Sequence, residues 1–506
     1  MKKNILILLS LIGLLSCSRT TSYDPRLPEI WPDYISVTIP AGTAPLNFNL
    51  DARYSKVFVR VQGSDGSILK ARGKTARFSI NGWHKITEAN AGDSLRVTVL
   101  GFKDGAWTQW KDFPIYVSKD TLDAWGVVYR KIAPGYETYS KIGNYQRNIH
   151  NFKESPIIES TLTPGQCVNC HTSNATNPDQ YTFHLRGKHG GTYFQVNGKG
   201  KWLTTKTANT ISNAVYPYWH PSGDYCACSN NFIHQSFWTG SGRLIEVWDD
   251  ASDISVIDVR TDEVITSPLV HTDWYETYPA FSPDGNTLYF CTAFPEEVPA
   301  NAEKVRYNLC SIGFDPEAGC FGNKVDTLIL ASRRGRSITF PRPSYDGRFI
   351  LYSEADFGCF PIDHKEADLY LLDLESGKRH ALNAANSEYA ESFHNWSADS
   401  RWILFSSRRA DGLYSLLYIC HIDEDGNASK PFLLPQKNPG RYYVNSLHSF
   451  NCPDFTLSKV KFRKGSTWKQ VTDPDRLTAK DKTNPDNEEI VSTTEPVDSS
   501  APVFMQ

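Results

Sequence analysis

Apolar and polar residues alternate along residues 30–118. The clearest runs are Ile35-Ser-Val-Thr-Ile39, Val57-Phe-Val-Arg-Val61, Leu95-Arg-Val-Thr-Val99 and Phe113-Pro-Ile-Tyr-Val117. Side chains two positions apart lie on the same face of a strand, so this period predicts strands with one buried face. Turn residues such as Asp65-Gly66 separate the runs. We therefore expect a small antiparallel β domain, with a sandwich of immunoglobulin type as its architecture.

A second pattern repeats along the C-terminal half: an aromatic residue, a polar turn and an apolar strand. The units begin at Tyr216, Tyr278, Phe340 and Phe393, and a degenerate fifth begins at Leu447. The turn position falls at Gly223, Gly285, Gly347, Ser400 and Asp454, with spacings of 62, 62, 53 and 54 residues. In the Ser-Pro-Asp-Gly turn, proline presets φ, aspartate bonds its own backbone and glycine accepts positive φ. Regular repeats of short strands predict a solenoid or a propeller.

The unit at 278–290, Tyr-Pro-x-Phe-Ser-Pro-Asp-Gly-x-x-Leu-Tyr-Phe, resembles the blade repeat of TolB-like β-propellers. The resemblance implies about six blades, the first of them in the strand-like stretch before residue 210. We expect an all-β chain in which the immunoglobulin-like sandwich covers 30–118, a connector 119–160 and the propeller 161–470. The polar composition of 471–506 predicts a disordered tail.

The N-terminus reads as an export signal. Two lysines precede an apolar run from Ile5 to Leu15, which is too short to span a bilayer permanently. Leu14-Leu15-Ser16-Cys17 resembles a bacterial lipobox, which implies a signal peptide over 1–16, lipidation of Cys17 and a tether over 17–29. The alternative is an ordinary cleaved signal with an incidental cysteine. Lipidation would anchor the body to a membrane of the cell envelope, outside the cytoplasm.

Composition removes some partners and ligands. The 53 Lys and Arg against 56 Asp and Glu leave a formal charge of −3, so electrostatics give no reason to expect a nucleic-acid partner. The only methionines are Met1 and Met505, which makes a thioether ligand to a buried metal scarce. Export would permit disulfides among the ten cysteines that follow Cys17, although several lie in apolar strand patterns typical of buried core residues.

One short motif carries recognisable chemistry. Cys167-Val-Asn-Cys170-His171 has the Cys-x-x-Cys-His spacing of c-type haem attachment. In such a site the two thiols add to the haem vinyl groups, and the adjacent histidine is the proximal iron ligand. His184, His189 and His150 are the nearby candidates for the second axial position, and an open sixth position is the other possibility.

Three alternatives to haem stay open. Cys167, Cys170, His184 and His189 also have the C-x2-C-x13-H-x4-H spacing of a zinc site. A disulfide between Cys167 and Cys170 would make a redox pair or a staple. The third alternative is a chance occurrence of the motif in a chain with 11 cysteines.

A second candidate site lies on the propeller axis. Counted back from the turns, one repeat column contains Glu276, Glu391 and Asn445, and another contains His394 and His448. Innermost propeller strands line a central channel, where such side chains would bind a sugar, a peptide or a divalent ion. The alternative is a hydrogen-bonded, water-filled channel, which Ala214 and Ile338 in the first column favour.

These features support three hypotheses. The first is a membrane-tethered c-type haem protein acting in electron transfer or haem-linked docking to a redox or envelope partner. The second is a haem-free envelope binding protein whose propeller captures a glycan, a peptide or a protein. The third is a lyase or hydrolase acting at the channel. The sequence has no Gly-x-Ser-x-Gly elbow, Walker loop or Rossmann fingerprint, so no familiar catalytic motif supports the third hypothesis. Whether the chain is an enzyme stays open.

Overall fold

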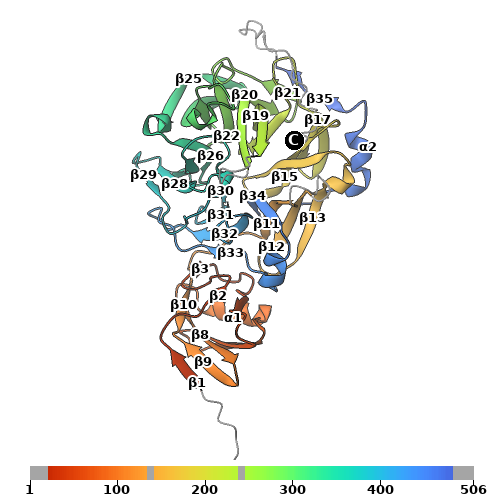
Figure 1. Ribbon diagram of the computed structural model, residues 1–506. Coiled ribbons are helices and arrows are strands. Elements are labelled where there is room, and N and C mark those ends of the chain that lie inside the picture. Colours follow the sequence, from red (N-terminus) through yellow and green to blue (C-terminus); the bar gives the residue numbers. More distant parts are fainter. Residues whose placement is uncertain (1–20, 134–141, 238–244, 483–506) are drawn as a thin grey trace, which may run out of the picture.

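The computed structural model describes residues 21–133, 142–237 and 245–482. The predicted signal peptide, Cys17 and the start of the tether lie outside these residues. Figure 1 shows a small N-terminal domain at one end of an elongated molecule and a larger ring of sheets at the other. Across the described ranges, none of the helices combines the length and the apolar character needed to cross a bilayer.

The N-terminal domain contains two sheets and one helix. The larger sheet contains β1 (Thr21–Asp24), β9 (Ala106–Trp110), β8 (Ser94–Lys103), β10 (Phe113–Val117), β3 (Thr38–Ile39), β5 (Lys56–Gln62) and β6 (Ile68–Gly73). The smaller contains β2 (Ile30–Trp31), β4 (Phe48–Leu50) and β7 (Thr75–Ala76). The domain is not purely antiparallel as expected, because β1 pairs with β9 and β3 with β10 in parallel.

Helix α1 (Ile80–Ala89) was also not predicted from the alternating pattern. It begins after Ser79, whose hydroxyl accepts a hydrogen bond from the Gly82 amide at 3.2 Å, and it buries Trp83 and Ile86 in the domain core. An N-cap of this kind satisfies an amide that has no partner within the helix.

Six further sheets make up the rest of the described chain. Sheet 1 contains β34 (Ser449–Thr456), β11 (Gly126–Ile132), β12 (Gly143–Asn148) and β13 (Glu154–Glu159). Sheet 2 contains β14 (Cys167–Asn174), β15 (Asn177–Arg186), β16 (Gly191–Val196) and β17 (Lys199–Thr204). Sheet 3 contains β18 (Ala214–Trp219), β19 (Tyr225–Phe237), β20 (Ile245–Asp258) and β21 (Glu263–Ile265).

Sheet 4 contains β22 (Tyr275–Phe281), β23 (Thr287–Ala293), β24 (Asn308–Asp315) and β25 (Cys320–Ile329). Sheet 5 contains β26 (Ser337–Pro343), β27 (Phe349–Ala355), β28 (Asp368–Asp373) and β29 (Arg379–Ala381). Sheet 6 contains β30 (Glu391–Trp396), β31 (Trp402–Ser407), β32 (Leu416–His421) and β33 (Phe432–Leu433). The strands β34, β14, β18, β22, β26 and β30 contact one another in that order, and β30 contacts β34 again. This closed ring of innermost strands defines a β-propeller.

Sheet 1 closes the ring with strands from both ends of the propeller sequence. Its innermost strand, β34, pairs antiparallel with β11, so that Phe455 lies opposite Val127. The segment 119–160, expected to be a connector, therefore contributes three strands to a sheet. Its strands had no repeat signal because their innermost partner lies more than 300 residues away.

The C-terminal segment continues past the ring and lies along its outer edge. Helix α2 (Thr467–Val471) is followed by β35 (Leu477–Thr478), which pairs in parallel with β17, and by β36 (Lys480–Asp481), which pairs in parallel with β21. The expected disordered tail at 471–506 is thus ordered up to residue 482, because its backbone extends two sheets.

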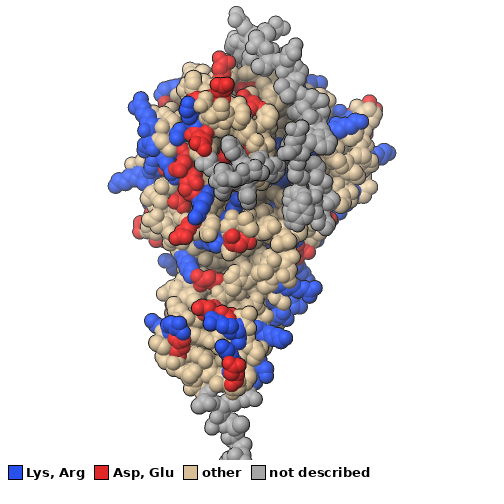
Figure 2. Space-filling model, viewed as in Figure 1, with Lys and Arg blue, Asp and Glu red and all other residues tan. Residues whose placement is uncertain are grey.

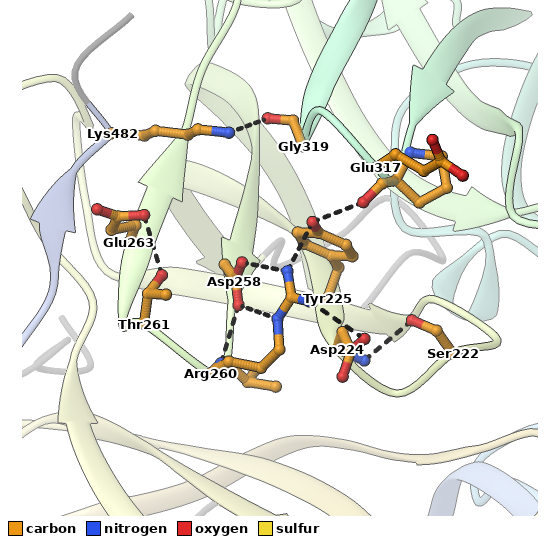
Figure 3. A network of polar contacts seen from close by, with 12 residues as sticks. Ser222, Asp224, Tyr225, Asp258, Arg260, Thr261, Glu263, Glu317, Gly319 and Lys482 are labelled. Carbon is orange, nitrogen blue, oxygen red and sulfur yellow. Dashed lines mark hydrogen bonds and ion pairs between the residues drawn. The ribbon is translucent and has the colours of Figure 1, made fainter.

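Figure 3 shows how this segment is held against sheets 3 and 4. The Lys482 ammonium donates to the carbonyl of Gly319 at 2.8 Å. Nearby, the Arg260 guanidinium bonds Asp258 and the Tyr225 hydroxyl, and that hydroxyl donates to the Pro316 carbonyl at 2.8 Å. The turn that ends β24 is thereby attached to both sheet 3 and the C-terminal segment.

The repeated turns have the conformation that the sequence predicts. Gly223, Gly285, Gly347 and Ser400 all have positive φ, between 58° and 79°. The fifth predicted turn is wrong, because Asp454 lies inside β34 and is buried.

The N-terminal domain packs on the edge of sheet 6. The Tyr34 hydroxyl donates to the Leu433 carbonyl at 3.1 Å, and the Asn47 amide donates to the Gln436 carbonyl at 3.1 Å. One continuous apolar cluster joins the two parts. Figure 2 shows Lys and Arg interspersed with Asp and Glu over the visible face of both.

Candidate functional site at the propeller axis

Every innermost strand of the propeller is interrupted at the same place. Each pairing shifts register by a β-bulge. At each bulge stands a non-glycine residue with positive φ between 22° and 55°: Cys170, Tyr216, Tyr278, Phe340, Phe393 and Cys452. A bulge turns a side chain away from its regular alternation, and a strained φ persists only where the surrounding packing holds it.

We call these six bulge residues the axial ring. Its aromatic members fill the middle of the propeller. The ring centroid of Tyr278 lies 4.7 Å from that of Tyr216 and 4.0 Å from that of Phe340, and Phe340 lies 5.0 Å from Phe393. The Tyr278 hydroxyl donates to the Cys359 carbonyl at 2.9 Å. Cys452 packs against the same cluster. The axis is therefore a packed core at this level, where the sequence had suggested a polar channel.

A cavity of about 210 Å³ lies at one end of the axis, beyond the axial ring. It is lined by the ends of β14, β18, β22 and β30 and by Tyr345, which follows β26. Because side chains from five of the six sheets surround one space, the cavity lies on the axis. Its walls are mixed: Tyr218, Trp219, Phe281 and Tyr345 supply aromatic rings, and polar residues such as Ser173 and Asn395 lie among them.

A buried carboxylate supports the wall of this cavity. Asp454 accepts one hydrogen bond from the Ser173 amide and another from the Asn395 side-chain amide, each at 2.9 Å, and both donors belong to lining residues. Burial raises the pKa of Asp454 to about 7, although the nearby Arg342 guanidinium opposes the rise. Arg342 lies 5.2 Å from the ring centroid of Tyr218. Because this pKa lies near neutral pH, Asp454 changes its charge there. The positions of Ser173 and Asn395 depend on this carboxyl group.

Two lining residues carry polar atoms with no partner. The Ser173 hydroxyl oxygen and the Trp219 indole nitrogen are buried and form no hydrogen bond with the described residues. Buried polar groups are nearly always hydrogen-bonded, so unpaired ones in a cavity wall are a sign of a missing ligand or water. Sequence reasoning did not select Ser173, Trp219 or Asp454. The repeat was the available signal, since correct alignment of β34 places Asp454 two positions after its bulge, as Asn395 is after Phe393.

The Cys-x-x-Cys-His motif lies in β14, the innermost strand of sheet 2. Cys170 belongs to the axial ring, and burial raises the pKa of its thiol. The Cys167 sulfur accepts a hydrogen bond from the Arg130 guanidinium at 3.5 Å. The His171 ring lies 6.1 Å from that of Tyr181, and burial lowers the pKa of His171 to about 3.

A c-type haem needs two thiols at the porphyrin edge and room for the macrocycle beside the imidazole. His171 itself suits an iron ligand, since burial favours its neutral form and neither of its nitrogens forms a hydrogen bond of normal geometry with a described residue. The packing does not suit a porphyrin, because Cys170 lies in the axial ring and the Tyr181 ring neighbours His171. Neither the axial cavity nor a second hollow, of about 440 Å³ beside Arg336 and Asp368, is lined by motif residues.

The other histidines of the zinc and haem predictions lie among other partners. His184 Nδ1 bonds the Thr192 hydroxyl at 3.0 Å, and burial lowers the pKa of His184 to about 3. The His189 ring packs edge-on against Trp468 of α2, at 5.7 Å. In the described ranges no three His, Cys, Asp or Glu side chains form a group suited to a metal ion.

The predicted column residues Glu276, Glu391 and His394 are buried between sheets. Glu276 Oε1 accepts from the Thr272 hydroxyl at 2.5 Å, and Glu391 Oε1 accepts from the Ser387 hydroxyl at 2.7 Å. His394 Nε2 lies 2.7 Å from the Phe340 carbonyl, and burial lowers its pKa to about 3.

The placement of Asn445 and His448 in these columns is wrong. Both precede β34, and Asn445 ends a short π-helical turn, Gly440–Val444. Since the bulge of β34 is at Cys452, the positions equivalent to Glu276 and His394 are Phe450 and Pro453. The motif residue His171 is the true counterpart of His394, each directly following its bulge residue.

No protein-family model matches the chain. A search of the curated proteins finds no match. Among solved structures the chain is similar to TolB from Acinetobacter baumannii, with 13% identity and a TM-score of 0.40 over 71% of this chain and 86% of that one. It is similar to a putative 6-phosphogluconolactonase from Bacteroides fragilis NCTC 9343, with 10% identity and a TM-score of 0.33 over 65% of this chain and 99% of that one.

The tricorn protease is a third similar structure, with 11% identity and a TM-score of 0.33 over 68% of this chain and 34% of that one. At these scores the similarities carry no argument about activity, ligand or partner. The class of the chain, a β-propeller with an N-terminal β domain, rests on its own sheets and on the ring that they form.

Proposed function

We propose that this chain is a binding protein of the cell envelope, tethered through Cys17, whose axial cavity holds a single sugar residue. In this proposal the six sheets are the blades of a TolB-type propeller, and the N-terminal domain is a spacer of immunoglobulin type. The observation that carries the proposal is the pair of unpartnered polar atoms, Ser173 Oγ and Trp219 Nε1, in a wall that combines aromatic and polar residues.

The chemistry of the wall favours a neutral ligand with hydroxyl groups. Tyr218, Trp219, Phe281 and Tyr345 offer ring faces for the C–H faces of a sugar. A sugar hydroxyl can accept from the indole N–H and exchange a hydrogen bond with the serine hydroxyl. The volume of about 210 Å³ is below that of most sites for drug-sized ligands, which favours one ring over a longer segment.

The test is calorimetric titration with glucose, galactose, mannose and N-acetylglucosamine, with glycine and acetate as non-sugar comparisons. We expect at least one sugar to bind, and Ser173→Ala and Trp219→Phe to weaken it about five- to tenfold, as loss of one hydrogen bond predicts. Thr339→Val is the matched control, since Thr339 also has a buried, unpartnered hydroxyl but does not line the cavity. Absence of sugar binding, or unchanged affinity in Ser173→Ala, would overturn the proposal.

The proposal also holds that the chain binds no haem. A haem stain and an absorption spectrum test this part of it. The chain is expressed in an exporting host that attaches haem to a known c-type protein, beside a Cys167→Ala/Cys170→Ala variant. We expect neither protein to show a Soret band. A covalent haem band that the double variant lacks would restore the haem hypothesis. Labelling with a radioactive fatty acid, lost in Cys17→Ala, tests the tether.

A further inference from the structure

Two repeats contain the same arrangement of hydrogen bonds around a buried glutamate at the start of their innermost strands. Glu276 in β22 and Glu391 in β30 each stand two positions before the bulge residue, Tyr278 or Phe393. Each carboxylate accepts from the hydroxyl of the residue four positions earlier, Thr272 or Ser387. It also accepts from the backbone amide of that residue, at 3.5 Å from Thr272 and 3.1 Å from Ser387. The two sites are thus built to hold a carboxylate in one orientation.

In sheet 6 an arginine also pairs with the glutamate. The Arg409 guanidinium bonds Glu391 Oε1 at 3.0 Å, and the Ser407 hydroxyl donates to the same oxygen at 2.7 Å. The guanidinium carbon lies 4.7 Å from the ring centroid of Tyr418 and 5.4 Å from that of Phe405. A buried carboxylate is therefore paired with a cation that aromatic rings flank, an arrangement that stabilises both charges.

In sheet 4 the position of that arginine is occupied by Phe294. Glu391 lies opposite Ser407 on the neighbouring strand, and Glu276 lies opposite Thr292, so the residue two further along is Arg409 in one repeat and Phe294 in the other. Phe294 is 62% exposed and packs edge-on against Trp274, which is 46% exposed, at 5.8 Å. An exposed aromatic pair thus stands where the other repeat has a cation.

In the described part of the chain, Glu276 in sheet 4 has no counterpart of the cation that Arg409 supplies in sheet 6. Glu276 is 3% exposed and faces two further carboxylates, Asp253 and Asp273. His271 Nδ1 lies 3.3 Å from Asp253 Oδ2, but burial lowers the pKa of His271, which disfavours its cationic form. Among the described residues, neither Glu276 nor Asp253 forms an ion pair with Lys or Arg.

We propose that the site formed by the buried carboxyl groups of Glu276 and Asp253 and the exposed rings of Trp274 and Phe294 binds a guanidinium group from another molecule, in the place that Arg409 takes in sheet 6. Entry of the cation favours the ionised form of the two carboxyl groups, which then supply the charge, and the two exposed rings contact the face of the cation. The group would come from an arginine side chain of a peptide or protein, or from a small free guanidinium compound.

The test is titration of the whole protein with N-acetyl-arginine amide at low salt, followed by ligand-observed NMR. N-acetyl-citrulline amide, which has nearly the same shape and no charge, is the comparison. We expect the arginine probe to bind at least about tenfold more tightly, since a charged hydrogen bond is lost in citrulline. Equal binding of the two probes would overturn the proposal.

Three variants locate the site. Glu276→Gln should abolish binding, and Trp274→Ala should weaken it several-fold. Phe294→Arg supplies the cation from within the chain and should abolish binding while the fold is retained, as far-UV circular dichroism would show. Trp468→Ala removes an equally exposed tryptophan from α2 and should leave binding unchanged. Undiminished binding in Phe294→Arg would also overturn the proposal.

Titration with a peptide distinguishes the two possible sources of the guanidinium group. An eight-residue peptide with one central arginine that binds much more tightly than N-acetyl-arginine amide indicates a polypeptide partner, and equal affinity indicates a free guanidinium compound. The site is separate from the axial cavity, so sugar binding in Phe294→Arg should equal that of the wild type. Failure of either proposal can therefore be recognised without the other.

Discussion

Replacing Glu276 by glutamine should change how the stability of the protein depends on pH. Burial is the main cause that raises the pKa of Glu276 from 4.5 to about 8, and the neighbouring Asp253 adds to the rise. In the unfolded chain the pKa returns to its ordinary value. A carboxyl whose folded pKa is raised contributes its full stability below the unfolded value, and this contribution is lost as pH rises through the folded value. The window of loss therefore runs from pH 4.5 to about 8.

The size of the effect follows from the shift. A rise from 4.5 to about 8 is 3.5 pH units, and at ~1.4 kcal/mol per unit the upper bound is about 5 kcal/mol. Glutamine does not titrate, so the variant lacks this loss. Near pH 5 the two proteins should have similar stability, and at pH 9 the variant should be the more stable by a few kcal/mol. Asp253, whose pKa burial raises to about 7, titrates in both proteins, so their difference contains the titration of Glu276 and its coupling to Asp253.

The assay is urea unfolding at pH 5, 7 and 9, followed by tryptophan fluorescence. Glu391→Gln is the matched control. Glu391 is 0% exposed and paired with Arg409, so its loss leaves a largely buried guanidinium without its countercharge and should cost about 3 kcal/mol at pH 7. If the stabilities of wild type and Glu276→Gln ran parallel from pH 5 to pH 9, the reasoning about an unbalanced buried carboxyl would be refuted.

Three further predictions concern the axis and the ring closure. Tyr278→Phe should lose the hydrogen bond to Cys359 and cost about 1 kcal/mol, whereas Tyr278→Ala should cost about 3–5 kcal/mol by opening a cavity in the axial ring; urea midpoints measure both. Phe455→Ala, in the closing strand β34, should also cost about 3–5 kcal/mol, and a loss below 1 kcal/mol would contradict the role of β34 as a core strand. Asp454→Asn should reduce the loss of stability expected of the wild type between pH 4 and 7, since burial raises the pKa of Asp454 from 3.8 to about 7. Thermal melts across that range measure how stability depends on pH, and the same dependence in variant and wild type would contradict the prediction.

The local features of the propeller could be read from the sequence. The period-two runs and the Ser-Pro-Asp-Gly turn depend on short-range sterics and on side chains that bond their own backbone. For this reason the turns at Gly223, Gly285, Gly347 and Ser400 were predicted correctly. Four of the six axial-ring residues were also found, as the aromatic residue that begins each repeat.

The errors arose where the pattern lacked its usual residues. Cys452 stands at the bulge of β34, but no aromatic residue marks it, and the fifth repeat was aligned from Leu447 instead. That shift moved Asn445 and His448 into columns where they do not belong and made Asp454 a turn residue. The same absence concealed Cys170 as the bulge residue of β14, so the sequence Cys170-His171 was interpreted only as part of a haem motif.

By itself the sequence determined the class of the chain, the positions of most turns and the strands that follow them, because these depend on neighbours a few residues apart. Only the tertiary structure decided that β11, β12, β13 and β34 share one sheet and that the residues at six bulges meet at the axis. It also decided that Ser173 and Trp219 line one cavity, whose wall the buried Asp454 supports through Ser173. The tertiary structure decided, too, that within the described ranges Glu391 pairs with a cation and Glu276 does not. These features depend on pairings between distant strands and on the charges that burial brings together, and a local pattern contains neither.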